Sequence, residues 1–450
     1  MASVSIAAGQ QTPGSQQPPA PTTPATPDQP LPGPGEPRPA PAEEPAPPPT
    51  EIPAAERPVP IPEDLVPAES FGVTVPRITL GGPDLFYPPA PRGRLQITPS
   101  LTLSGEFNDN VGARETGRRS DFIGALSPGI TLTAQQPQYR IFAGYNTSAE
   151  FYARDSDRNE IGKRHRLFGD VFYRSSPRLT FTVTERFIFD RNTDLVTASG
   201  VSTGRRDAYR NTITPGLRYQ ATPLTALRMN ASYTLLRFDE SEDVVSGAED
   251  SDTYRVSLGA ERVFTPRLLG TADFGFAYFN IEDEPEAYTY TPRVGLEYQI
   301  TQTMRGRISA GPNILQQDGD VEVLPAVTVG LEKAYRWGRV LAGYDRAITA
   351  DGIGITDRHS VLGIVSVRTL ARGLVVEFTP RYTMAEVQRD SDREVQALSL
   401  NLRAVYRIAR GFSLVGSYTF FHQTSDRGFI EYDQNRVFLG LQYAYPISFD

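Results

Sequence analysis

The chain of 450 residues lacks cysteine and has only one tryptophan, three histidines and two lysines, Lys163 and Lys333. The absence of cysteine excludes zinc fingers of the usual kind, thiol nucleophiles and iron–sulfur centres. Acidic residues outnumber basic ones and the net charge is −8, which argues against a nucleic-acid partner because phosphate binding needs a basic face. No apolar run of about 18 residues occurs, which excludes a transmembrane helix but not membrane-spanning β-strands of about 9 to 11 residues.

The scarcity of histidine also limits the chemistry. His165, His359 and His422 lie far apart in the sequence, with none in metal-ligand spacing with another, so we expect no metal site and no cofactor. The one crude candidate for a hydrolytic group is His422 with the nearby Ser425 and Asp426. A hydroxyl and an acid near a histidine are commonplace, and no glycine-rich phosphate loop follows a strand, so the sequence predicts a protein that is not an enzyme.

Proline is abundant at one end of the chain and scarce elsewhere. Of the 39 prolines, 26 lie in the first 92 residues. Residues 1–64 are too poor in large apolar groups to offset ordering entropy, which predicts a disordered periplasmic tether. Apolar residues return in 65–92, which we expect to be a short ordered segment that docks on or inside the following domain. Residues 5–8 (SIAA) resemble the cleavage region of a signal peptide, whose start we expect upstream of Met1.

Residues 93–450 alternate between apolar and polar side chains with a two-residue period. Near residue 400, for example, Leu400 and Leu402 share one face while Asn401 and Arg403 share the other. This period is typical of β-strands with one buried face. The alternating segments lie near 93–109, 120–134, 139–153, 163–174, 179–190, 207–220, 225–239, 251–263, 268–281, 287–300, 305–317, 321–334, 339–349, 357–369, 374–388, 395–408, 411–425 and 432–449.

The length and the connectors of these eighteen segments point to a membrane barrel. Each segment with its connector takes about 20 residues, whereas globular strands run to about 5 or 6. Every second connector is a tight turn such as 221–223 or 371–373, while the others are mostly longer and often acidic, as in 239–252 with seven carboxylates. Short turns at one rim and longer loops at the other are typical of bacterial outer-membrane barrels. The sequence thus predicts an all-β, 18-stranded antiparallel transmembrane β-barrel, with both termini periplasmic.

Seven of the predicted strands contain an internal proline. Proline lacks the backbone N–H that a ladder needs and usually marks an edge or a bulge. By the alternation all seven lie on the lipid face, where we expect them to mark bulges. They are Pro99, Pro128, Pro215, Pro292, Pro312, Pro325 and Pro380.

The opposite face of the predicted wall is rich in arginine and carboxylates. A barrel of this size is too wide for side chains to fill, so such a face lines a water-filled lumen. Two interpretations stay open: the charges form cross-strand pairs that hold the wall, or bands of arginine guide an anionic solute. The candidate pore-lining residues are Arg186, Arg210, Arg218, Arg228, Arg255, Arg293, Arg305, Arg307, Arg381, Arg403, Arg407, Glu261, Glu297 and Glu377.

Two short motifs resemble those of known outer-membrane proteins. The C-terminal Gly440, Tyr443, Tyr445 and Phe449 resemble the signal that directs barrels to the barrel-assembly machinery, with an unusual Phe438 inside the motif. Residues 99–111 (PSLTLSGEFNDNV) resemble the opening motif of the β-barrel porin-2 family. That resemblance implies an outer-membrane β-barrel, often associated with exopolysaccharide systems.

Three functions compete on this evidence. The first is a passive conduit in polysaccharide export, for an anionic polymer, because acidic outer loops oppose uptake of anions from outside. Its partners would be outer-membrane lipid and a periplasmic export protein bound by residues 1–92. The second is a general diffusion porin for small solutes, which predicts a long loop folded inward; the longest loops, 191–206 and 240–250, are modest. The third is a structural or adhesion barrel with a closed lumen.

Overall fold

The structure is a computed structural model that describes residues 95–449 apart from 197–199, 239–249, 283, 351–352, 369, 389–392 and 427–430, with the side chains of 191–196 and 203–206 also left out. The predicted tether, 1–64, and the predicted docking segment, 65–92, lie outside the described residues. The one helix in the described part is the three-residue turn η2, Ser156–Arg158, and no described helix is a candidate membrane span.

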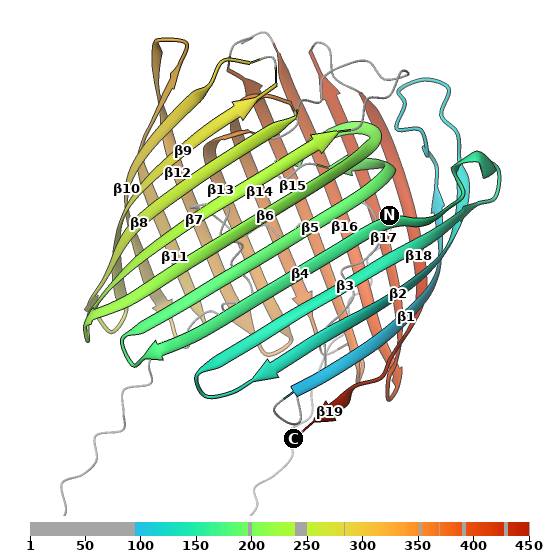
Figure 1. Cartoon of the computed structure of the whole chain (residues 1–450), viewed down its shortest axis with the longest axis horizontal. Coiled ribbons are helices and arrows are strands. Elements are labelled where there is room, and N and C mark those ends of the chain that lie inside the picture. Colours follow the sequence, from blue (N-terminus) through green and yellow to red (C-terminus); the bar gives the residue numbers. More distant parts are fainter. Residues whose placement is uncertain are drawn as a thin grey trace, which may run out of the picture. The chain divides into compact units, whose positions relative to one another are not determined.

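The chain folds into one antiparallel sheet that closes on itself (Figure 1). Eighteen long strands pair in sequence order, and β1 closes the ring by pairing with both β2 and β18. The short β19 continues β18 after a two-residue break and pairs with the start of β1. The predicted 18-stranded barrel is confirmed. The strands are β1 Leu95–Asn108, β2 Asp121–Gln135, β3 Tyr139–Tyr152, β4 Glu160–Ser176, β5 Leu179–Val196, β6 Ser202–Thr222, β7 Thr225–Phe238, β8 Ser251–Thr265, β9 Leu268–Ile281, β10 Ala287–Thr301, β11 Met304–Gln317, β12 Asp320–Tyr335, β13 Gly338–Ala350, β14 Ile355–Val367, β15 Leu374–Val387, β16 Glu394–Ala409, β17 Phe412–Ser425, β18 Tyr432–Ala444 and β19 Ile447–Phe449.

Most strand bounds lie close to the predicted ranges, with one instructive difference. The segment 191–206, expected to be a loop, is mostly strand, because β5 runs on to Val196 and β6 begins at Ser202. Backbone pairing continues there with two register shifts. The sequence of this stretch is mostly polar and shows no two-residue hydrophobic period. Only the backbone pairing therefore reveals that the hairpin continues.

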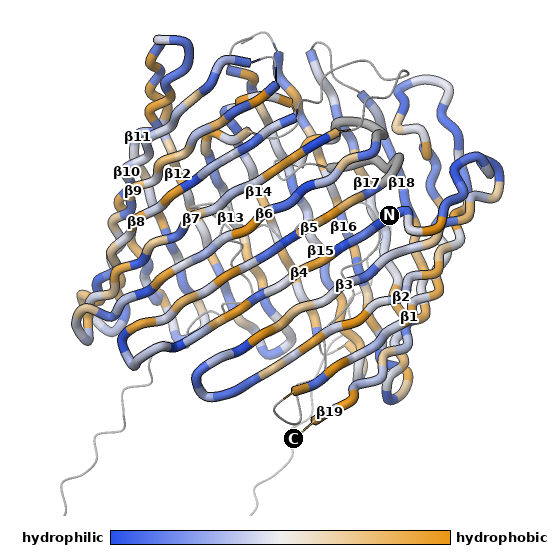
Figure 2. The backbone as a smooth tube through the Cα atoms, viewed as in Figure 1, coloured by the Kyte–Doolittle hydropathy of each residue, from blue (hydrophilic) through white to orange (hydrophobic). Residues whose placement is uncertain are grey.

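Hydrophobic and hydrophilic residues alternate along the strands (Figure 2), and the two faces of the wall differ in polarity. Large apolar side chains are exposed on the outer face, as for Leu103 (63% exposed) and Val294 (70%). Their sequence neighbours on the inner face are polar, as for Thr102 and Arg293, which are buried. Water would penalise such an apolar belt, by roughly 25 cal/mol per Å², so the outer face is built for an apolar surround.

The seven strand prolines lie on the outer face, as predicted, but they do not mark bulges. Around Pro292 and Pro312, for example, the pairing of β10 with β11 has the same register on both sides of the prolines. The register shifts lie elsewhere, mostly next to tight turns, as between Gln299 and Thr301. The prediction of bulges is wrong because a proline that lacks its N–H interrupts a ladder locally without adding a residue to the strand.

Turn chemistry explains the shortest connector on the long-loop rim. Between β11 and β12 the chain reverses at Asp318 and Gly319, whose φ values are +54° and +85°. Positive φ at both central residues is the signature of the tight hairpin turn that Asp-Gly favours. The other described connectors alternate between tight turns and longer loops, as the sequence predicted.

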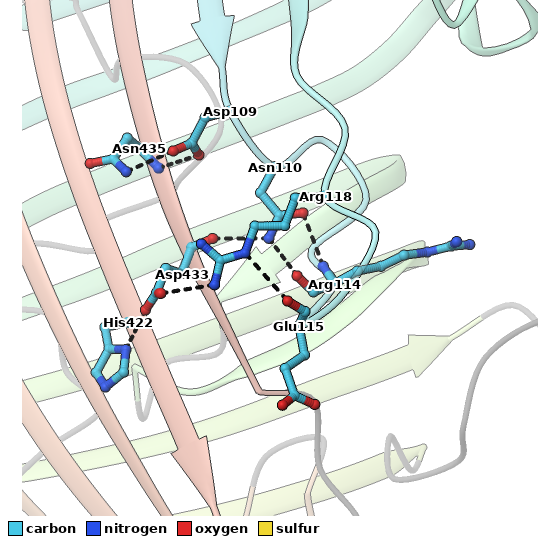
Figure 3. Close-up of polar contacts among 8 residues, drawn as sticks. All are labelled: Asp109, Asn110, Arg114, Glu115, Arg118, His422, Asp433 and Asn435. Atoms are coloured by element: carbon cyan, nitrogen blue, oxygen red, sulfur yellow. Dashed lines mark hydrogen bonds and ion pairs between the residues drawn. The ribbon is translucent and has the colours of Figure 1, made fainter.

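The loop between β1 and β2 clasps the seam at which the barrel closes (Figure 3). The Asp109 carboxylate accepts hydrogen bonds of 2.7 Å from both the backbone N–H and the side-chain amide of Asn435 on β18. Asn110 donates to the backbone carbonyl of Asp433 at 2.9 Å, and Arg118 forms a 2.9 Å ion pair with the Asp433 carboxylate. The clasp therefore reinforces the pairing of β1 with β18, the first and last of the eighteen long strands.

We expect Asp109→Ala to weaken this seam. The variant removes two charge-assisted hydrogen bonds, each worth about 1 to 3 kcal/mol. We therefore expect the barrel to unfold at a lower temperature when samples are heated in detergent and the folded and unfolded forms are then separated by electrophoresis in the cold. Asp320→Ala, which removes an exposed carboxylate at another hairpin on the same rim, is the matched control. Equal shifts for the two variants would contradict a specific role of the clasp.

Candidate functional site

The predicted pore-lining residues all alternate with the exposed apolar residues and so belong to the inner face of the wall. They are Arg186, Arg210, Arg218, Arg228, Arg255, Arg293, Arg305, Arg307, Arg381, Arg403, Arg407, Glu261, Glu297 and Glu377. Whether they line a conducting pore is a separate question and stays a prediction. The structure brings several of them together in networks that span neighbouring strands.

One network joins β6, β7, β8 and β9. Glu261 accepts from Arg218 at 2.6 Å and from Arg228 at 2.7 Å. Arg228 also reaches Asp273 at 2.7 Å. Two guanidinium groups and two carboxylates thus balance one another across four strands, which is the pairing that cross-strand neighbours allow.

A second network follows β10 to β13. Arg305 forms a 2.6 Å ion pair with Glu332 and lies 3.8 Å from Glu297. Arg339 approaches the same Glu332 at 3.5 Å. These contacts support the interpretation that the inner-face charges hold the wall as cross-strand pairs.

Further inner-face pairs were not predicted. Arg164 lies 2.9 Å from Glu150 and 3.6 Å from Asp190, and Arg358 lies 2.9 Å from Asp345. Arg164, Asp190, Asp345 and Arg358 were missed although each has the sequence parity of the inner face. That parity is the signal that could have found them, because side chains of a strand alternate strictly between faces.

A loop crosses the lumen from one wall to the other. Between β5 and β6, the backbone N–H of Ser202 donates to the side-chain oxygen of Gln423 on β17 at 2.7 Å, and the Gln423 amide donates back to the Ser202 carbonyl at 3.1 Å. The neighbouring Val201 is fully buried in a cluster with Ile353, Ala385 and Val395. We call residues 200–202 the loop tip.

Gly200 lets the loop tip approach the opposite wall closely. Its φ is +96°, and a Cβ atom there would lie 2.7 Å from Arg381 Cζ and 2.9 Å from Thr383 Oγ1 of β15. In the ring of eighteen strands β6 and β15 are nine strands apart, so they face each other across the lumen. The loop tip therefore narrows the lumen. For 191–206, the expectation of a loop too modest to fold inward is wrong, because the extended β5–β6 hairpin carries a short tip across. The other loop named, 240–250, lies almost entirely outside the described residues.

A second loop also packs against inner-wall residues. Ala113, in the loop between β1 and β2, is buried against Ala397, Phe421 and Tyr432 of β16, β17 and β18. Val111 of the same loop is fully buried with other residues of β2 and β3. The long-loop end of the lumen is thus lined by two loops as well as by the wall.

The three histidines contact neighbouring strands rather than one another. The pairs are His165 with Tyr145, His359 with Tyr344, and His422 with Asp433. The carboxylate bound to His422 thus comes from β18, which sequence proximity to Ser425 and Asp426 did not indicate. Among the described residues no group of three metal-ligating side chains lies together.

The C-terminal motif lies at the seam. Gly440 pairs with Ser104 of β1, and Tyr443, Tyr445 and Phe449 are exposed on the outer face. The unusual Phe438 points inward and lies over Gly440, where a Cβ atom would be 3.0 Å from its ring. The role of the motif as an insertion signal for the barrel-assembly machinery stays a prediction.

No protein-family model and no curated protein matches the sequence. Among solved structures the chain is similar to OccAB4 of Acinetobacter baumannii, with 13% identity over 79% of this chain and 99% of that chain and a TM-score of 0.44. OccK9 (OpdG) of Pseudomonas aeruginosa has 14% identity over 79% and 100%, with a TM-score of 0.44. The siderophore receptor PirA of Pseudomonas aeruginosa has 10% identity over 79% and 81%, with a TM-score of 0.41. At identities of 10 to 14% these likenesses concern the fold alone. The resemblance to the β-barrel porin-2 family stays a prediction.

We expect Glu261→Gln to make the lumen more selective for anions. The variant removes the carboxylate shared by Arg218 and Arg228 and leaves one more positive charge on the inner face, so the anion-to-cation permeability ratio from reversal potentials in a salt gradient rises. Because the pairs are partly exposed, the stability cost is about 1 kcal/mol or less. Glu386→Gln removes the same charge from the outer face near the rim and is expected to leave the ratio unchanged; an unchanged ratio in Glu261→Gln contradicts the assignment.

Proposed function

We propose that this protein is an outer-membrane channel for the diffusion of small solutes. The observation that carries the proposal is the loop tip bound across the lumen, with Val201 fully buried and Ser202 hydrogen-bonded at both its backbone groups. An inward loop is the feature that distinguishes a diffusion porin from a wide conduit. A barrel of about 16 to 18 strands otherwise encloses an aqueous channel.

The outer face and the rims support the location. The belt of exposed Leu, Val, Ile and aromatic side chains is what a hydrocarbon surround requires. Leu95 and Phe449 pair at the rim of tight turns, which in outer-membrane barrels is the periplasmic rim. We therefore propose the bacterial outer membrane, with both ends of the barrel domain on the periplasmic side.

The polar inner wall supports passage of water-soluble molecules. Its guanidinium and carboxylate groups pair with one another in the networks described above, so the inner surface is strongly polar. Export of a polysaccharide would need the loop tip to leave its site on β15 to β17, because a chain that threads the barrel must pass it. The diffusion channel needs no such movement and is therefore the better supported of the two.

The full-length protein in planar bilayers tests this proposal. We expect steady, constitutively open conductance, and swelling of liposomes in small solutes with a sharp size cut-off. A closed barrel gives no conductance. A polymer conduit gives little conductance until the tip is released, together with loss of surface polysaccharide in a deletion strain; either result overturns the proposal.

Gln423→Ala tests the loop tip directly. It removes two hydrogen bonds worth about 1 kcal/mol each, so the undocked fraction of the tip rises roughly 30-fold. We expect larger single-channel conductance and more current noise, with a higher size cut-off in liposome swelling. Ser417→Ala, on the inner face of the same strand, is the control. A conductance equal to that of the unaltered protein would show that the tip does not limit flow.

A further inference from the structure

The inner wall contains a hollow of about 110 Å³ away from the loop tip. It lies over β1, β2, β3 and β4, beside the closing strand β18. The side chains of its floor are small and mostly hydroxylic, including Ser100, Thr102 and Ser127. Gly129 is part of this floor, and a Cβ atom there would lie 2.9 Å from Ser100 Oγ and 3.3 Å from Asn146 Cβ. The depth of the hollow therefore depends on the absence of larger side chains.

Two phenylalanine rings border the hollow on opposite sides. Phe168 of β4 lies over its register partner Gly144 of β3, where even a single Cβ atom would clash with the ring. Phe438 of β18 lies over Gly440 in the same way. Glycine thus lets each ring lie close to the wall, and both rings border the hollow. Aromatic rings placed this way offer an apolar surface to the C–H groups of a ligand.

The charged groups at the hollow are matched in sign. Glu150 is paired with Arg164 at 2.9 Å, and Glu106 with Arg436 at 2.7 Å. Both carboxylates and Arg164 border the hollow, together with Arg166. Two acidic and two basic groups in the lining give no net charge, so the hollow favours neither anions nor cations. Paired ions of this kind still offer strong hydrogen bonds to neutral hydroxyl groups.

Two hydroxyl groups of lining residues, those of Thr147 and Ser148, make no hydrogen bond with any described residue, and Ser148 is the one whose sequence parity is that of the inner face. Ser148 is 7% exposed and lies on the inner face of β3, and its Oγ makes no hydrogen bond with any described residue. A buried polar group without a partner costs about 1 to 3 kcal/mol. A ligand that supplies a hydroxyl group at this point would recover that cost.

We propose that this hollow is a binding site for a neutral polyhydroxylated solute, of the size of one sugar ring. Hydroxyl donors and acceptors in the floor, aromatic rings at the sides and a charge-balanced rim together match such a molecule better than a carboxylate or an amine. The hollow is smaller than the cavity of roughly 150 Å³ that encloses benzene. Because it is open to the lumen, it would hold one face of a single sugar ring while the rest of the molecule stays in the lumen. The proposal rests on the proposed channel function only for delivery of the solute to the lumen.

Binding is measured on the full-length protein in detergent, so that the result does not depend on conductance. The probes are D-glucose and myo-inositol, and acetate is the anionic comparison. Saturation-transfer NMR measures the binding of each probe to the protein. We expect saturable transfer to glucose or inositol at millimolar concentration and weaker transfer to acetate. Absence of saturable transfer to both neutral probes, or stronger binding of acetate, overturns the proposal while leaving the channel function untouched.

Three variants localise the site. Ser127→Phe fills the hollow and is expected to weaken binding at least tenfold, whereas Ser257→Phe adds the same ring to the inner face of β8, outside the hollow, and leaves it unchanged. Ser148→Ala, which removes its unpartnered hydroxyl without adding bulk, weakens binding several-fold. Electrophoresis of heated and unheated samples in detergent shows, by their different migration, whether each variant is folded. Equal binding by Ser127→Phe and Ser257→Phe places the solute elsewhere and overturns the assignment.

Discussion

Every backbone N–H and C=O in the wall must find its partner inside the sheet, because an apolar surround offers none. That constraint requires closure, and closure requires that β1 and β18, the first and last of the eighteen long strands, pair with each other. The clasp of the β1–β2 loop on Asp433 and Asn435 reinforces the pairing. Strand prolines are tolerated because each interrupts only one point of a ladder whose register is held on both sides.

Closure also decides what the inner face can be. With eighteen strands the interior is too wide to be filled by side chains alone, so the inner residues are polar and pair across neighbouring strands. The networks around Glu261 and Glu332 are examples, each joining two arginines to a shared carboxylate. Such pairs contribute little stability when partly exposed. They do keep the inner face polar and its charges nearly balanced.

The lumen is shaped by contacts that span it. The loop tip leaves one wall and binds Gln423 on another. This contact favours the proposed narrowed channel over a wide conduit. At the proposed solute site the lumen is widened rather than narrowed. Gly129, Gly144 and Gly440 add no side chain to the wall, and two of them let a phenylalanine ring lie close to it. Narrowing and binding thus occupy different parts of the inner surface.

The sequence alone determined the strand number, the alternation of faces and the inward position of residues such as Arg228 and Arg305, because a two-residue period is a local property of the chain. It also located the outward prolines and the tight turns. Only the tertiary structure decided which charges meet, that Ser202 binds Gln423 221 residues away, and that Phe168 and Phe438 border one hollow. Those contacts depend on which strands face each other around the ring. No local pattern in the sequence indicates which distant residues meet there.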